Sequence, residues 1–253
     1  MITDLQKASM LKRISAAILD LILLAVAVCG FALLLSAILG YDDYHRQLND
    51  FYAKYESQYG IDFDIPDEEY LNMPEDQRQL YDNAYAALVA DQDAIHVYNM
   101  VLNLTLVIAT VSILLSYLIL EFTIPLIFGN GQTMGKKIFA IGLMHTDGVK
   151  ISAVQLFIRT VIGKYTLETM IPVYIVIMLF FNTLGLMGTL ILAAIGLLQI
   201  ILMAATKTNS AIHDKVAMTV AVDISSQKIF ESYNEQLEYI KRVQSERAAR
   251  QSY

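Results

Sequence analysis

The chain has 253 residues, 56% of them hydrophobic, and its mean hydropathy of +0.48 is too high for an ordinary soluble domain. The net charge of −7 comes mostly from one acidic segment, residues 41–96, so it gives no indication of nucleic-acid binding. Composition therefore excludes a soluble globular protein and favours an all-α polytopic membrane protein.

Residues 1–40 begin with a short amphipathic lead and continue into the first predicted transmembrane helix. Asp20 is the only charged residue between positions 14 and 39, and Arg13 lies about two helical turns before it on the same face. A carboxylate in or near hydrocarbon is costly and generally has a partner or a function. Because residues 21–39 alone nearly span a bilayer, we expect Asp20 at or just inside the membrane boundary.

Residues 41–96 form an acidic, tyrosine-rich insertion with fourteen Asp and Glu residues against three Lys and Arg residues. Apolar and aromatic side chains recur at helical spacing, which predicts a helical hairpin. Two interpretations stay open for this segment. It could be a vestibule that attracts cations or a site for a partner, or it could be a solvated acidic face over a tyrosine-rich core.

Residues 97–128 form the second predicted transmembrane helix, which we expect to end around Glu121, Pro125 and Gly129. The run 129–137 that follows, Gly-Asn-Gly-Gln-Thr-Met-Gly-Lys-Lys, superficially resembles a phosphate-binding loop. That motif requires glycine five residues before its Gly-Lys pair and Ser or Thr after the lysine. Those positions hold Asn130 and Lys137, so the run is better interpreted as a turn into a basic segment.

That basic segment, residues 129–166, is predicted to contain a small hairpin and an amphipathic helix. Residues 138–144 are typical of a strand or a short helix, and Asp147-Gly148 is a strong turn signal. Ser152 and Gln155 then have the spacing of a capping box. The basic helix expected over residues 153–164 would lie in the membrane interface.

Residues 167–206 contain two further predicted spans. The uncharged stretch 171–205 would be about 52 Å long as one straight helix, far longer than a bilayer of about 30 Å. We therefore expect it to fold back at residues 182–188, giving spans at 167–181 and 189–205. Four transmembrane helices result in all, with three as the alternative.

Residues 207–253 form a C-terminal segment with a strand-like run over 216–223 and a charged helical tail over 228–253. The excess of Lys and Arg in this segment, in the N-terminus and in residues 129–166 predicts that all three are cytoplasmic. The acidic insertion 41–96 would then lie outside.

This topology brings a set of polar residues to one depth on the cytoplasmic side, where they could satisfy one another. The predicted charge cluster, a possible ion or proton site, consists of Arg13, Asp20, Glu121, Arg159 and Asp214, supported by Gln199, His213 and Lys136. The four histidines are scattered, so no metal site is predicted and no catalytic residue is assigned.

On these residues the chain resembles the RDD family of bacterial membrane proteins, named for one arginine and two aspartates. Arg13, Asp20 and Asp214 look like the three name-giving residues. Residues 131–137, and Asp147-Gly148 followed by the helix with Arg159, are similar to the family as well. The resemblance covers about residues 8–40 and 97–223 and implies that residues 41–96 are an insertion. It also implies a link to sodium–proton exchange, which is reported for some members.

Two functions follow as expectations. The first is cation- or proton-linked transport through the charge cluster, and the alternative is a structural or scaffolding role in which an Arg13–Asp20 ion pair fixes helix packing. An enzymatic role is disfavoured.

We expect no cofactor and no nucleic acid. The expected partners are a bilayer, a monovalent cation or proton, and further copies of the chain. The expected location is the bacterial cytoplasmic membrane. The sequence shows no two similar halves with interrupted helices, the usual pointer to a transporter site.

Overall fold

The computed structural model describes residues 6–180, 185–206 and 208–251, and it divides into two compact units. Unit 1 consists of Met1–Val28 and Ile113–Tyr253, and unit 2 consists of Cys29–Ser112. The first and second long helices each contribute residues to both units.

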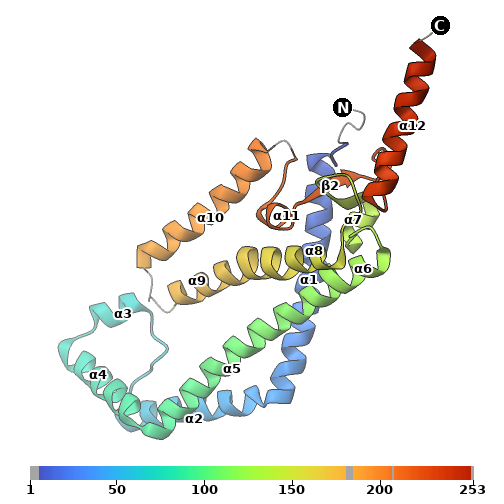
Figure 1. Ribbon diagram of the computed structural model, residues 1–253. Coiled ribbons are helices and arrows are strands. Elements are labelled where there is room, and N and C mark those ends of the chain that lie inside the picture. Colours follow the sequence, from blue (N-terminus) through green and yellow to red (C-terminus); the bar gives the residue numbers. More distant parts are fainter. Residues whose placement is uncertain (1–5, 181–184, 207, 252–253) are drawn as a thin grey trace. The chain divides into compact units, whose positions relative to one another are not determined.

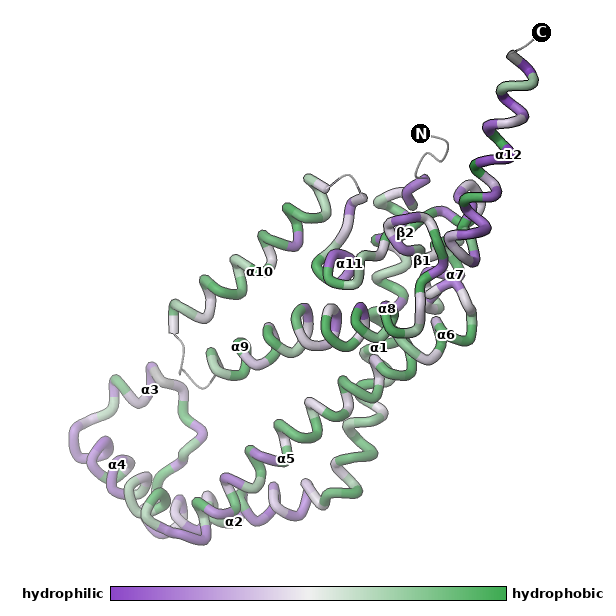
Figure 2. Tube along the Cα trace, in the orientation of Figure 1, coloured by the Kyte–Doolittle hydropathy of each residue, from purple (hydrophilic) through white to green (hydrophobic). Residues whose placement is uncertain are grey.

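Within the described residues, four helices are long and apolar enough to cross a membrane, namely Met10–Leu39, Gln92–Phe128, Ala153–Leu179 and Gly185–Ala205. Their apolar side chains largely face outward, as for Leu33, which is 74% exposed, and Figure 2 shows them as hydrophobic along most of their length. Exposed apolar surface of this extent is typical of helices surrounded by lipid. The predicted fold class, an all-α membrane protein with four spans, is confirmed.

The first and fourth of these helices are regular. Helix α1 is Met10–Leu39, so the predicted span 21–39 is its second part. Helix α10 is Gly185–Ala205. The predicted turn at 182–188 is therefore wrong for residues 185–188, which are helical, and its first three residues lie outside the described residues.

The second and third long helices continue through positions at which the sequence suggested that a helix ends. α5 (Gln92–Tyr117), a π-helix η1 (Leu118–Thr123) and α6 (Ile124–Phe128) follow one another without interruption, and Gly129 ends them at φ 80°. Neither Glu121 nor Pro125 ends this helix, because Thr160 Oγ1 donates to the Glu121 carbonyl at 2.9 Å, in place of the amide that Pro125 lacks.

The predicted interfacial helix is the first part of the third span. α8 (Ala153–Phe157) opens with the predicted Ser152–Gln155 capping box and continues into a π-helix, η2 (Ile158–Met170), and α9 (Ile171–Phe180). The charged residues of 153–164 therefore belong to the same helix as the apolar stretch that follows.

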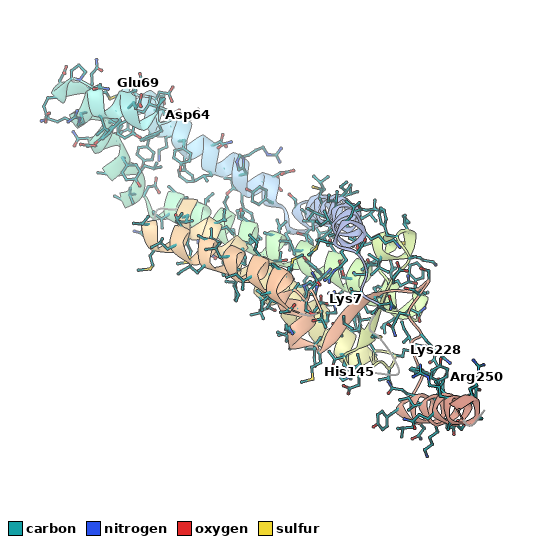
Figure 3. The ribbon with its side chains drawn as sticks, turned by 90° about the horizontal axis from the view of Figure 1, so that it is seen from above. Lys7, Asp64, Glu69, His145, Lys228 and Arg250 are labelled. Atoms are coloured by element: carbon teal, nitrogen blue, oxygen red, sulfur yellow. The ribbon has the colours of Figure 1, made fainter. Side chains whose placement is uncertain are left out.

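A two-stranded antiparallel sheet joins distant parts of unit 1. Strand β1 (Ile141–His145) pairs with β2 (Thr219–Asp223), in register Ile141 with Asp223. The predicted turn at Asp147-Gly148 is present, with Met144 bridged to Lys150, but the strand that pairs with β1 along its length is β2, a pairing that the sequence did not indicate. The N-terminal lead is extended and bridges β2 through Lys7 and Val222, and Figure 3 labels Lys7 and His145 near the sheet.

The short helices and the C-terminal tail complete unit 1. α7 (Met134–Ile138) precedes β1 and α11 (Ile212–Val216) precedes β2. The core beneath the sheet contains Leu143, Leu156 and Ala221. The tail helix α12 (Tyr233–Gln251) extends away from the sheet, as Figures 1 and 3 show, and is mostly hydrophilic in Figure 2.

Unit 2 contains the acidic insertion, which is helical as predicted. α2 (Tyr41–Tyr59), α3 (Asp67–Asn72) and α4 (Glu75–Ala90) lead into the start of α5. Its small core is built on Tyr55, Leu88 and Ala94.

Candidate functional site

A cavity of about 410 Å³ opens among polar side chains of unit 1. Its polar lining residues come from α1, α5, α7, η2, α10 and α11. They are Arg13, Asp20, Tyr117, Lys136, Arg159, Lys164, Glu168, Thr169, Gln199 and His213. Six of the eight predicted residues therefore line one cavity, whereas Glu121 and Asp214 lie behind its wall in contact with lining residues.

Asp214 is the most tightly held of the predicted residues. Its carboxylate is 1% exposed and accepts hydrogen bonds from Arg159 Nε at 3.0 Å and from Arg159 Nη2 at 2.9 Å. Arg13 Nη2 donates to its second oxygen at 3.2 Å. Although burial acts to raise the pKa of Asp214, the nearby cations, among them both guanidiniums, hold it well below its ordinary value.

The predicted ion pair between Arg13 and Asp20 is wrong, because Arg13 binds Asp214 instead. The reason is geometric. Residues two turns apart lie on one helix face, but about 10 Å separates them along the axis. A side chain from another helix can approach Arg13 more closely than Asp20 can.

Asp20 holds the start of α7. Its Oδ2 accepts a hydrogen bond from Thr133 Oγ1 at 2.5 Å, and its Oδ1 accepts one from the Gly135 amide at 2.8 Å. Thr133 is the N-cap of α7 and also accepts from the Lys136 amide. A Cβ on Gly135 would collide with the carbonyl oxygen of Ala16, so only glycine allows α7 to approach α1 this closely. The segment 129–137, which superficially resembles a phosphate-binding loop, therefore serves to attach α7 to Asp20.

Lys136 lies between the two acids of the first two spans. Its Nζ is 3.9 Å from Asp20 Oδ2 and 3.9 Å from Glu121 Oε2, and it donates to Thr133 Oγ1 at 3.2 Å. Burial lowers the pKa of Lys136 to about 7, outweighing the opposite effect of Glu121. Lys164 donates to Glu121 Oε1 at 2.5 Å, while Oε2 is buried without a hydrogen-bond partner among the described residues.

Glu168 was not predicted as a site residue, yet it binds the start of α11. It accepts from the His213 amide at 2.9 Å and contacts His213 Nδ1 at 2.7 Å. Gln199 donates to the same carboxylate at 3.2 Å and accepts from the Ile212 amide at 3.2 Å. Burial lowers the pKa of His213, and the charge of Arg159 lowers it further. Sequence reasoning missed Glu168 although it falls within the predicted span 167–181, where a charged residue is itself a signal of a functional site.

The π-helix η2 supplies much of this site. Arg159, Lys164 and Glu168 all lie on it, and π-helical turns occur frequently at functional sites. Gly163 faces α11, where a Cβ would lie 2.6 Å from His213 Cβ. The glycine therefore permits the close packing that places Glu168 against His213.

Two segments of the site repeat one local structure. α7 and α11 are five residues each, and the residue two positions after each helix, Ala140 or Met218, has φ 54°. A five-residue strand with the same burial pattern follows in both cases. Leu143 and Ala221, equivalent positions of the two segments, face each other at the centre of the sheet. The two segments are therefore related by an approximate twofold axis through the sheet.

The repeat extends to the membrane helices. In each half, two spanning helices precede the short helix, and an acid of the first of them, Asp20 or Glu168, accepts the amide of the second residue of that short helix. Glu121 and Gln199 lie equally far before the short helices of their halves. The halves are thus more alike than the sequence suggested, although α7 and α11 lie outside the spanning helices and do not interrupt them. This similarity is not apparent from the sequence, because only Lys137 in the segment 133–145 is identical to its counterpart in the segment 211–223, Lys215.

The family model described as the RDD family matches residues 7–218 of the chain, a range that includes all eight predicted site residues. No curated protein matches the chain, and no solved structure matches it.

Proposed function

This chain belongs to the RDD family, a family of membrane proteins, and from that premise we propose that its cavity binds a proton or a small monovalent cation and serves its transfer across the membrane. The observation that carries the proposal is the cavity itself. All four spanning helices contribute residues to its wall, together with α7 and α11, and the wall includes both acidic and basic side chains. Ionisable residues in such helices generally belong to functional sites.

Within the cavity, the Glu168–His213 pair is the strongest candidate to carry a proton. A histidine ordinarily changes its charge close to neutral pH, although burial lowers the pKa of His213, and here it contacts a carboxylate at 2.7 Å. Lys136, also in the cavity wall, has its pKa lowered by burial to about 7. A carboxylate, an imidazole and an amine that can exchange protons thus line one cavity.

The structural repeat supports the same proposal. In many transporters, substrate and coupling-ion sites lie between two repeats, close to interrupted helices. α7 and α11 lie outside the spanning helices and do not interrupt them, but both contribute to the cavity wall, and each is held by an acid of its own half. By the distribution of Lys and Arg, we propose that the cavity and both termini face the bacterial cytoplasm. Four spans leave little room for alternating access in one copy, so we propose a homo-oligomer as the transporting form.

Proton flux across reconstituted vesicles tests the proposal. The purified full chain would be placed in proteoliposomes with an entrapped pH dye, and a proton or sodium gradient would be imposed. We expect dissipation that requires the protein and is abolished by Glu168→Gln, which keeps the side-chain shape, and reduced by Asp20→Asn. Asp223→Asn, outside the cavity, is the matched control. Unchanged flux in Glu168→Gln, or no flux from a folded protein, would overturn the proposal.

A structural or scaffolding role is the second candidate, and the arrangement around Asp214 favours it. A carboxylate held by two arginines has no free position for an ion, and such a triad fixes three helices relative to one another. If this role is the whole function, Glu168→Gln should lower thermal stability or the yield of an assembled complex while no flux exists to be lost.

A further inference from the structure

Unit 2 contains a second cavity, separate from the polar one. It has a volume of about 280 Å³ and is formed only by residues of α2, α4 and the first turns of α5. Its lining consists of three tyrosines and five aliphatic residues: Leu48, Tyr52, Tyr85, Leu88, Val89, Ala94, Ile95 and Tyr98. No lysine or arginine lines it, although cations are abundant around the polar cavity.

The three tyrosines give this pocket an electron-rich surface. Burial raises the pKa of Tyr52, and the neighbouring Tyr98 and Tyr85 raise it further, so Tyr52 is a neutral phenol at physiological pH. Tyr52 is additionally held by an edge-to-face contact with Phe63, with ring centroids 5.8 Å apart. The faces of aromatic rings attract cations.

The charge of the surrounding unit points to the same class of ligand. Its insertion carries fourteen acidic residues against three basic ones, and Figure 3 labels two of the acids, Asp64 and Glu69. Asp91 does not line the pocket but lies next to it, since its carboxylate accepts a hydrogen bond from the amide of the lining residue Ala94. Of the three basic residues, Lys54 is held by that aspartate and Arg46 by Asp43. A surface of this sign concentrates cations from solution.

We propose that this tyrosine-lined pocket binds a small organic monocation, a quaternary or alkylated ammonium ion whose apolar groups fill the aliphatic wall. An inorganic cation would find no set of oxygen ligands among the lining residues, and a neutral apolar molecule would gain nothing from the acidic surroundings. This binding site is independent of the function proposed for the polar cavity, because it involves different residues in the other unit.

Choline and its uncharged carbon isostere, 3,3-dimethylbutan-1-ol, provide the test. Calorimetric titration of the full chain in detergent micelles would compare the two, which have nearly the same shape. We expect choline to bind about three- to thirtyfold more tightly than the alcohol, the range that a cation–π contribution corresponds to, and to bind more weakly as salt is added. Equal affinities would show an apolar pocket only, and absent choline binding would overturn the proposal outright.

Two variants separate ring and hydroxyl contributions. Tyr85→Leu removes an aromatic face from a side chain that is 56% exposed, so folding should tolerate it, and choline affinity should fall severalfold. Tyr52→Phe keeps the ring and should change affinity less. Tyr70→Phe, on α3 outside the pocket, is the control. A loss of affinity in the control equal to that in Tyr85→Leu would contradict the assignment of the pocket.

Discussion

Replacing Asp214 by asparagine should destabilise this protein more than any similar change at its surface. Asparagine keeps the shape and one carbonyl oxygen, but it removes the charge that two arginines share. Arg159 and Arg13 would then stay in place with side chains only 3% and 11% exposed and no counterion in their contact. Removing one partner of a buried ion pair costs about 3–5 kcal/mol. For a chain of this length that corresponds to a decrease in Tm of roughly 6–20 °C.

The measurement is thermal unfolding of the full chain in detergent, followed by circular dichroism. Asp223→Asn is the matched control, since Asp223 binds Lys12 at 2.6 Å but this lysine is 40% exposed. Ion pairs of that kind contribute about 1 kcal/mol or less. Replacing all three members, Asp214→Leu with Arg13→Met and Arg159→Met, should recover much of the lost stability, because no unpaired charge remains. A Tm for Asp214→Asn within about 2 °C of the wild type would refute the reasoning.

Three further results are expected. Gly163→Ala should lower the free energy of unfolding by about 1–3 kcal/mol, because the new Cβ would lie 2.6 Å from His213 Cβ. Gly196→Ala is the control and should leave Tm nearly unchanged, because no heavy atom lies within 4 Å of its new Cβ. Equal effects of the two substitutions would contradict the packing argument. The lowered pKa of His213 means that the unfolded chain binds more protons just below pH 6.5, so stability should decrease as the pH falls through that region, and this dependence should be smaller in His213→Gln. For Lys136, whose pKa is about 7 in the fold and 10.5 otherwise, stability should increase between these values as the pH rises, and Lys136→Met should flatten that part of a Tm–pH profile.

The spans could be predicted from the sequence because hydrophobicity is a property of local composition. Long uncharged runs identify α1 and α10 without knowledge of any contact. The ends of the second and third helices could not be predicted in the same way. A proline and a glutamate usually signal a boundary, but Pro125 falls in the first turn of α6 and Glu121 is satisfied by Lys164. Whether a charge ends a helix or enters it depends on a partner that only the tertiary structure provides.

The candidate site was predictable as a set of residues but not as a set of contacts. Depth along a helix follows from residue numbers, which is why six predicted residues line one cavity. Pairing depends on the rotation and approach of helices, and here it is decided by glycines whose role is visible only in contact. Gly135 lets Asp20 bind α7, and Gly163 lets Glu168 reach His213. Local strand signals likewise located β1 and β2 but could not show that they pair with each other.

The two halves of the site differ most where the repeat places equivalent residues. Lys136 occupies the position in α7 that Asp214 occupies in α11, so the charge is reversed between the halves. Asp214 meets two arginines and has every oxygen bound. Lys136 meets two carboxylates at 3.9 Å each, beside a buried Glu121 oxygen without a hydrogen bond. Because closely paired charges resist titration and loosely paired buried ones do not, the α11 half would keep its central charge over the whole physiological range. The α7 half would change its charge near pH 7. Asp214 would thus be a fixed centre, while Lys136, together with the Glu168–His213 pair that we propose as a proton carrier, would exchange protons.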